Sequence, residues 1–175
     1  MNPAVTSLSG FIEQHHRWLD ELLLSHQMAL VEKRLQAAKT FYHCFQRALS
    51  IHAQAEDRIL LELHSQHCPN PRWHTQVYFH EHRKIYDLLD KIAQRVDALT
   101  VIQTVDVIEL LDMEKTLKGV LEHHGEREEQ GLMPELQSSL SDSHRLALMQ
   151  QLDDYWCSTL AAIRKTVAGL QYGLI

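Results

Sequence analysis

The feature of the sequence that most limits its fold is a repeated pairing of histidine and glutamate at helical spacing. His52 precedes Glu56 by four residues in the first half of the chain, and His124 precedes Glu128 by four in the second half. On an α-helix, side chains four residues apart share one face, with Cβ atoms about 5 to 6 Å apart. Each pair therefore predicts a helix that presents an imidazole beside a carboxylate.

A second repeat lies upstream of each pair. Residues 14–23 (QHHRWLDELL) line up with residues 80–89 (HEHRKIYDLL), and this alignment superimposes His16 on His82. The two halves of the chain thus predict two helical hairpins. Each hairpin carries one histidine on its first helix and one His-x-x-x-Glu pair on its second helix.

Apolar residues at helical spacing, with few glycines and prolines between them, predict an all-α protein. The expected helices cover about 8–27, about 32–65, a segment around 79–96, a segment from a cap at Thr104 to an end at Pro134, and about 142–170 after a cap at Ser141. Their apolar faces include Leu63, Phe79 and Leu146. We expect one domain over 1–175, an up-down-up-down four-helix bundle over about 8–137 with an additional C-terminal helix.

Charge and composition exclude several classes of protein. A net charge of −6 and a pI near 6.1, without a clustered basic face, argue against a nucleic-acid partner. No apolar run approaches the roughly 18 residues of a membrane helix, and the N-terminus lacks export features, so we expect a cytoplasmic protein with no membrane partner. Cys44, Cys68 and Cys157 form no CxxC pair and are expected to be small core or surface residues in a reducing compartment.

Histidine is unusually abundant, with thirteen in 175 residues. The six repeated histidines and glutamates all lie on apolar stripes, so we expect them to face the core, where unpaired polar groups are costly. They are His16, His52, Glu56, His82, His124 and Glu128. Two metal ions bridged by the glutamates, each completed by two histidines, would satisfy these groups, as in other bundle-core dimetal sites. Imidazole and carboxylate donors without cysteine favour iron, with manganese or zinc as substitutes.

The order of these residues resembles that of the hemerythrin-like HHE cation-binding domains, over Leu8 to about Leu136. The resemblance implies a hemerythrin-like bundle around two iron ions with an oxide or hydroxide bridge, and it carries the ligand roles to the six residues just named. The sequence departs from the oxygen-carrying hemerythrins, which have a second histidine on the third helix and an aspartate five residues after the fourth-helix histidine. Here Tyr78 and Tyr86 flank His82, and the fourth helix offers Glu128.

The resemblance therefore implies that one iron lacks a histidine which the oxygen carriers have, and several neighbouring residues are alternatives for this open position. His15 and His123 each precede an expected ligand by one residue, and either could replace it or support it from the second layer. Tyr78 or Tyr86 could fill the position, donate a hydrogen bond there, or simply pack in the core. A loop with two prolines is expected at residues 68–71. The histidines and the cysteine around this proline-bearing loop could form a surface metal site, although a solvated loop is the simpler interpretation. They are His64, His67, His74 and Cys68.

The leading functional hypothesis is a non-heme diiron protein that binds or reduces O2, NO or peroxide, with weak peroxidase-like, catalase-like or NO-reducing turnover left open. An iron or oxygen sensor is one alternative, and an iron donor that repairs damaged iron centres is another. A metal-free bundle would leave four imidazoles and two carboxylates facing one another in the core. The sequence also leaves a homodimer open.

Overall fold

The computed structural model describes residues 7–171, and every regular element in that range is helical. The α-helices are α1 (Leu8–Val31), α2 (Leu35–Ala55), α3 (Leu61–His67), α4 (Thr75–Asp97), α5 (Thr104–Arg127), α6 (Met133–Ser139) and α7 (Asp142–Gln171). Two π-helical segments, Glu56–Leu60 and Glu128–Leu132, join α2 to α3 and α5 to α6. The prediction of an all-helical chain is confirmed for the described residues.

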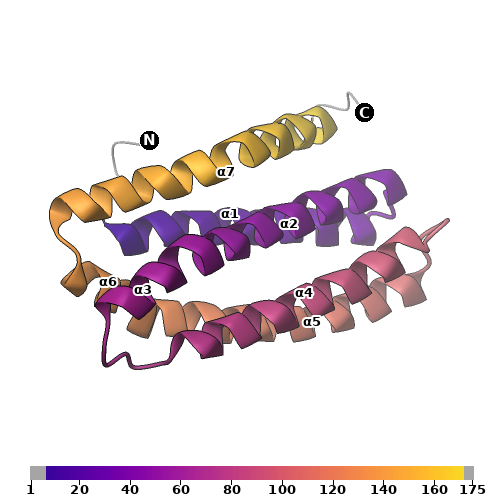
Figure 1. Ribbon diagram of the computed structural model, residues 1–175. Helices are drawn as coiled ribbons and strands as arrows, with labels where there is room; N and C mark the ends of the chain where they lie inside the picture. The colour runs from indigo at the N-terminus through magenta and orange to yellow at the C-terminus, as the bar shows by residue number, and fades with distance from the viewer. Residues whose placement is uncertain (1–6, 172–175) are drawn as a thin grey trace.

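The long helices form a bundle of two hairpins with one additional helix along its side (Figure 1). Helix α1 packs on α2, and α4 packs on α5, while α2 contacts α4 and α1 contacts α5. Helix α7 runs along α2 and also contacts α1, whereas α3 meets α6 at one end of the bundle. Helix α7 therefore covers the first hairpin.

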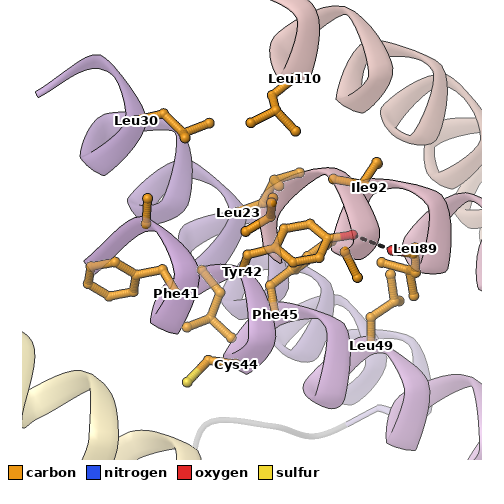
Figure 2. Close-up of a cluster of buried hydrophobic side chains, with 14 of the residues drawn as sticks. Leu23, Leu30, Phe41, Tyr42, Cys44, Phe45, Leu49, Leu89, Ile92 and Leu110 are labelled. Carbon is orange, nitrogen blue, oxygen red and sulfur yellow. Dashed lines mark hydrogen bonds between the residues drawn. The ribbon is translucent and has the colours of Figure 1, made fainter. Parts of the chain in front are cut away.

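The core of the bundle joins the two hairpins through apolar side chains. Figure 2 shows Leu23, Tyr42, Phe45 and Leu89 within one buried cluster. The Tyr42 hydroxyl donates a hydrogen bond to the Leu89 carbonyl oxygen at 2.7 Å, so the polar end of this buried ring is satisfied across the α2–α4 contact. Burial of their apolar faces stabilises these helices, since amphipathic helices derive most of their stability from tertiary contacts.

The turn between α1 and α2 begins later than the sequence indicated. Helix α1 continues to Val31, and α2 begins at Leu35 instead of near residue 32. Lys33 adopts a left-handed backbone with φ of 56°. A glycine or asparagine commonly marks such a position, and a lysine does not, so the sequence carries no clear turn signal here.

Helix α5 also differs from its predicted ends. Gln103, and not Thr104, is the N-cap, and it forms a capping box with Asp106. The helical chain continues through Pro134, which lies in the first turn of α6 after the π-helical segment. Proline is tolerated in a first turn because its missing N–H would have no intrahelical partner there.

Two residues expected on apolar faces are exposed. Phe79 is 37% exposed, while its neighbour Tyr78 is fully buried, and Leu146 near the start of α7 is 61% exposed. The predicted cap at Ser141 is confirmed, because its hydroxyl accepts a hydrogen bond from the backbone N–H of His144. None of the described helices combines the length and the apolar character needed to cross a membrane.

Candidate metal centre

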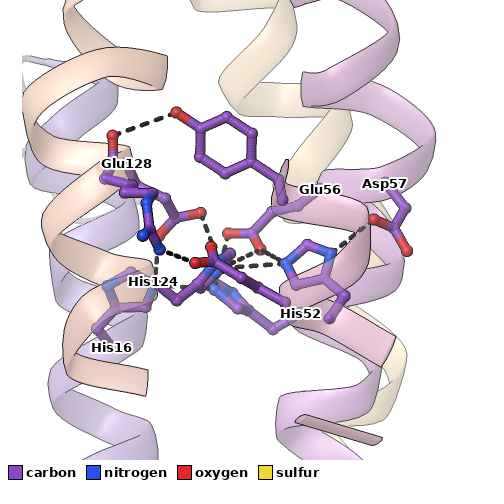
Figure 3. Close-up of polar contacts among 10 residues, drawn as sticks. His16, His52, Glu56, Asp57, His124 and Glu128 are labelled. Atoms are coloured by element: carbon purple, nitrogen blue, oxygen red, sulfur yellow. Dashed lines mark hydrogen bonds and ion pairs between the residues drawn. The ribbon is translucent and has the colours of Figure 1, made fainter. Parts of the chain in front are cut away.

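The structure brings the six predicted ligand residues together between the four helices of the two hairpins, α1, α2, α4 and α5. His16 comes from α1, His52 from the last turn of α2, His82 from α4 and His124 from the last turn of α5, and Glu56 and Glu128 are the first residues of the π-helical segments. Figure 3 shows the side chains converging, with Glu56 and Glu128 between the imidazoles. The two glutamates and three of the histidines are buried, and the His16 side chain is 26% exposed.

The first hairpin contributes one pair of histidines, His16 and His52, which we call half-site A. Their Nε2 atoms lie 3.0 Å apart. Glu56 Oε1 lies 2.9 Å from Nε2 of His52, and Glu128 Oε2 lies 3.3 Å from Nε2 of His16. Half-site A therefore combines two imidazole nitrogens with one oxygen from each carboxylate.

The second hairpin contributes the other pair, His82 and His124, which we call half-site B. Their Nε2 atoms are also 3.0 Å apart. Glu56 Oε2 lies 3.2 Å from Nε2 of His82, and Glu128 Oε1 lies 3.4 Å from Nε2 of His124. Each glutamate thus directs one oxygen to half-site A and the other to half-site B, which is the arrangement of two bridging carboxylates.

The donor atoms of the cluster are compatible with a pair of metal ions. All four oxygens of Glu56 and Glu128 are buried without a hydrogen-bond partner of acceptable geometry among the described residues, although histidine nitrogens lie nearby. Two ligands at right angles on an ion, each at about 2.1 Å, are separated by about 3.0 Å. The Nε2 separation of 3.0 Å within each half-site equals that value, and it also equals the length of a hydrogen bond between the two imidazoles.

The π-helical segments explain how these carboxylates enter an apolar core. A π-helical turn inserts one residue, and such turns occur frequently at functional sites. One extra residue rotates the following positions by about 100° around the helix. Beyond Glu56, the buried positions are Ile59, Leu60, Leu61 and His64, whereas the predicted position Leu63 is only half-buried.

A layer of carboxylates supports half-site B, and sequence reasoning missed its role. Nδ1 of His82 lies 2.6 Å from Asp57 Oδ1, and Nδ1 of His124 lies 3.1 Å from Glu81 Oε2. Glu81 also pairs with Arg127. A carboxylate on Nδ1 fixes the tautomer of a metal-binding histidine and leaves Nε2 free to coordinate. The available signals were two acidic residues next to expected ligands: Asp57 directly follows Glu56, and Glu81 directly precedes His82.

The pKa values of His16, His82 and His124 are shifted in opposite directions in the two half-sites. Burial alone would lower the pKa of His124, but Glu128 and Glu56 outweigh burial and raise it to about 10. Burial alone would also lower the pKa of His82, but its hydrogen bond to Asp57 and the nearby carboxylate of Glu56 raise that pKa. In half-site A, burial lowers the pKa of His16 despite the opposing charge of Glu128.

The carboxyl of Glu56 remains ionised in this environment. Burial alone would raise its pKa, but the charge of His52 and contacts with His124 and His82 hold the pKa well below its usual value. A fully buried carboxylate is costly unless positive charge lies beside it. The cluster is thus ready to accept cations without first deprotonating its central bridging group.

The alternative ligand residues lie outside the six-residue cluster. His123 is 75% exposed beside Glu126, and the Tyr78 hydroxyl donates to the Arg127 carbonyl oxygen at 3.3 Å. His15 packs against Trp156 of α7 with ring centroids 3.7 Å apart, and its ring also stacks on His52. Burial and the neighbouring His52 and His16 lower the pKa of His15 to about 3, so it is neutral at ordinary pH.

A cavity of about 560 Å³ connects the cluster with the surface between α1 and α5. Its inner wall includes His16, His52, Glu56, His82 and His124 together with the apolar side chains of Leu19, Leu23, Phe45, Leu49, Ile85 and Leu121. Exposed residues of both helices form its rim: Asp20, Leu24, Lys118, Glu122, Glu126 and Glu129. The arrangement gives a small molecule a largely apolar route to the donor atoms.

The interpretation of the proline-bearing loop as solvated is wrong for two of its residues. His64 and Cys68 are buried, whereas His67 and His74 are exposed. The side chain of His74 instead caps α4 by accepting a hydrogen bond from the Gln76 N–H. Among the three cysteines, Cys44 and Cys68 are buried, Cys157 is exposed, and all are free, as expected.

Comparison with known proteins adds no relative to this picture. No family model matches the chain, and no curated protein and no solved structure matches it significantly. The functional assignment therefore depends on the geometry and chemistry of the described residues.

Proposed function

We propose that the chain is a non-heme diiron protein with a hemerythrin-like bundle, and that it binds or reduces a small oxidant such as O2, NO or peroxide. One observation carries the proposal: each of two buried glutamates directs its oxygens to two different histidine pairs, and none of these oxygens has a well-oriented hydrogen-bond partner among the described residues. Four imidazoles and two carboxylates, without a thiolate among them, are donors that favour iron over zinc.

Iron bound by these residues would supply the electrons that reduce the oxidant. The chain's own part is to hold the ions and to limit access of water. His82 and His124 are oriented by Asp57 and Glu81, so their Nε2 atoms need no reorganisation before binding. The apolar wall of the cavity lowers the number of competing water molecules beside the donors.

Tyr86, which follows His82 by one turn on α4, is a candidate proton donor for the cluster. Its hydroxyl is buried without a hydrogen-bond partner among residues 7–171. Burial and the charges of Asp57 and Glu56 raise its pKa, so the hydroxyl keeps its proton at ordinary pH. We expect Tyr86→Phe to retain the metal ions and to slow turnover of peroxide, and an unchanged rate would exclude this role.

The first test is elemental analysis of aerobically purified protein together with its near-ultraviolet absorption spectrum. About two irons per chain, with charge-transfer bands of a bridged diiron centre, would support the proposal. Absence of iron even after anaerobic loading with ferrous ion would contradict it. Peroxide and NO turnover then separate an oxidant-reducing protein from a sensor or an iron donor, both of which would bind iron without turnover.

Access through the cavity can be tested at a glycine that has a matched partner on the same helix. A Cβ atom built on Gly125 or on Gly119 meets no heavy atom within 4 Å, but only Gly125 lines the cavity. Gly125→Leu should slow the reaction with peroxide severalfold and leave the metal content unchanged, whereas Gly119→Leu should alter neither. Equal rates in the two variants would show that the oxidant enters elsewhere.

A further inference from the structure

A second cluster of metal-binding side chains lies at the end of the bundle where α3 meets α6 (Figure 1). His64 and Cys68 are four residues apart at the end of α3, and Glu135 lies in the first turn of α6. Each of the three offers a donor atom within 4.8 Å of the donor atoms of the other two. None of these residues belongs to the six-residue centre.

The present contacts leave this cluster incompletely satisfied. His64 Nε2 lies 2.6 Å from Glu135 Oε2, and the Arg72 N–H donates to Glu135 Oε1 at 2.7 Å. His64 is fully buried, and its Nδ1 has no hydrogen-bond partner among the described residues. The thiol of Cys68 has only a contact of 3.4 Å with the hydroxyl of Ser139. A buried imidazole with one unpartnered nitrogen, beside a thiol with a single long contact, leaves these side chains less than fully satisfied.

We propose that His64, Cys68 and Glu135 bind one divalent ion of the zinc class, separate from the dimetal centre. A thiolate, an imidazole and a carboxylate are all established zinc ligands, and the soft sulfur selects zinc over calcium, magnesium or manganese. The thiolate and the carboxylate together balance the two positive charges of the ion. Three protein ligands leave one tetrahedral position for solvent.

The geometry requires only small side-chain adjustments. Donors at zinc distances of about 2.0 to 2.3 Å are separated by about 3.3 to 3.6 Å around a tetrahedral ion. The donor atoms of the cluster already lie within 4.8 Å of one another, and the contact between His64 and Glu135 would lengthen as the ion takes the place of the shared proton. The backbone hydrogen bond from Arg72 holds the carboxylate in position throughout.

Cobalt(II) substitution tests this site without interference from the dimetal centre. Thiolate coordination to cobalt(II) produces a near-ultraviolet charge-transfer band, and the six-residue centre contains no cysteine. We expect chelator-treated full-length protein to develop the band on titration with cobalt(II). The band should persist in the double variant Glu56→Gln, Glu128→Gln, so failure of the diiron proposal would not remove it.

Two cysteine variants provide the matched comparison. Cys68→Ser should abolish the band, and Cys44→Ser, which alters another buried free cysteine, should retain it. Absence of the band in the wild-type protein at saturating cobalt(II), or its survival in Cys68→Ser, would overturn the proposal. If Cys68→Ser loses its helical circular dichroism, Glu135→Gln decides instead: it should weaken cobalt(II) binding at least about tenfold, and unchanged affinity would contradict the site.

Discussion

Half-sites A and B use the same donors in different surroundings. In B, the Nδ1 atoms of His82 and His124 each contact a carboxylate, whereas in A the Nδ1 of His52 is buried without a partner among the described residues. Half-site A lies beside α7, where His52 stacks on Trp156 with ring centroids 5.3 Å apart. The sequence repeat specifies which donor atoms converge, and the residues outside the repeat make the two half-sites unequal.

This difference has consequences for metal binding. Carboxylates on Nδ1 raise the basicity of the histidines in B and should strengthen their hold on a metal ion. The pKa values of His82 and His124 are also raised, by Asp57 and Glu56 at His82 and by Glu128 and Glu56 at His124, so a metal ion at B competes with protons. We therefore expect the ion in A to exchange with chelators faster than the ion in B.

The largest expected effect removes both half-sites together. Glu56 is shared by A and B, so Glu56→Gln should lower the metal content from about two ions to one or none and should lower the melting temperature. Elemental analysis and thermal unfolding measure the two effects. Glu62→Gln, an exposed change in the same hairpin, should leave both at wild-type values. Full metal content in Glu56→Gln would remove this residue from the site.

The next effect concerns the cover of half-site A. Trp156 is fully buried against Phe11, His15 and His52, and Trp156→Ala should reduce the free energy of unfolding by about 3 to 5 kcal/mol. The ion in A should then be lost to chelators before the ion in B. Denaturant titration measures the free energy of unfolding. The control Leu146→Ala, on the same helix, should change that free energy by less than about 0.5 kcal/mol.

A smaller effect should be confined to half-site B. Asp57→Asn keeps the size of the side chain but removes the carboxylate from Nδ1 of His82, and such changes weaken metal affinity about 10- to 100-fold. Competition with a chelator should show one weakened ion and one unchanged ion. The exposed change Asp87→Asn serves as control. Equal weakening of both ions would mean that the half-sites are coupled and not independent.

A further effect is a pH dependence that originates beside half-site A. The pKa of His15 is about 3 in the folded protein, below the ordinary value of 6.5, because of burial and the nearby His52 and His16. Between those values the unfolded chain binds a proton that the folded chain does not, so stability falls as pH decreases through this window. In chelator-treated protein, His15→Gln should lose less stability between pH 7 and pH 4 than wild type does, by thermal unfolding. The exposed change His67→Asn serves as control and should lose as much stability between pH 7 and pH 4 as wild type. An equal loss of stability in wild type and His15→Gln, or a reduced loss in His67→Asn, would exclude His15 as the source.

Much of the candidate centre could be predicted because it follows helical spacing. His52 and Glu56, and likewise His124 and Glu128, share a helix face by sequence alone, and the structure does bring them together with His16 and His82. That these residues bind iron stays a prediction. The bundle could be predicted as helical from the same periodicity, since long apolar stripes need no tertiary information to be recognised.

The other parts of the fold and of the candidate site could not be predicted, because they depend on tertiary contacts and on a change of helical register. The π-helical turn after Glu56 moves the buried face by one residue, so His64 takes the place expected for Leu63. No local pattern signals that turn, and none indicates that Glu135, seventy-one residues from His64, packs against it. Asp57 and Glu81 were visible as acidic neighbours of ligands, but which histidine each supports depends on how the hairpins meet.

The division of donors between the hairpins has a consequence for ancestry. Each hairpin contains two imidazoles and one carboxylate of the set, so two copies of a single hairpin would supply the same six donors as the whole chain. A symmetric pair of identical hairpins would have to keep its two ion positions alike. A single chain with two different hairpins is free of that constraint, and the carboxylates around one position and the tryptophan beside the other are differences of this kind.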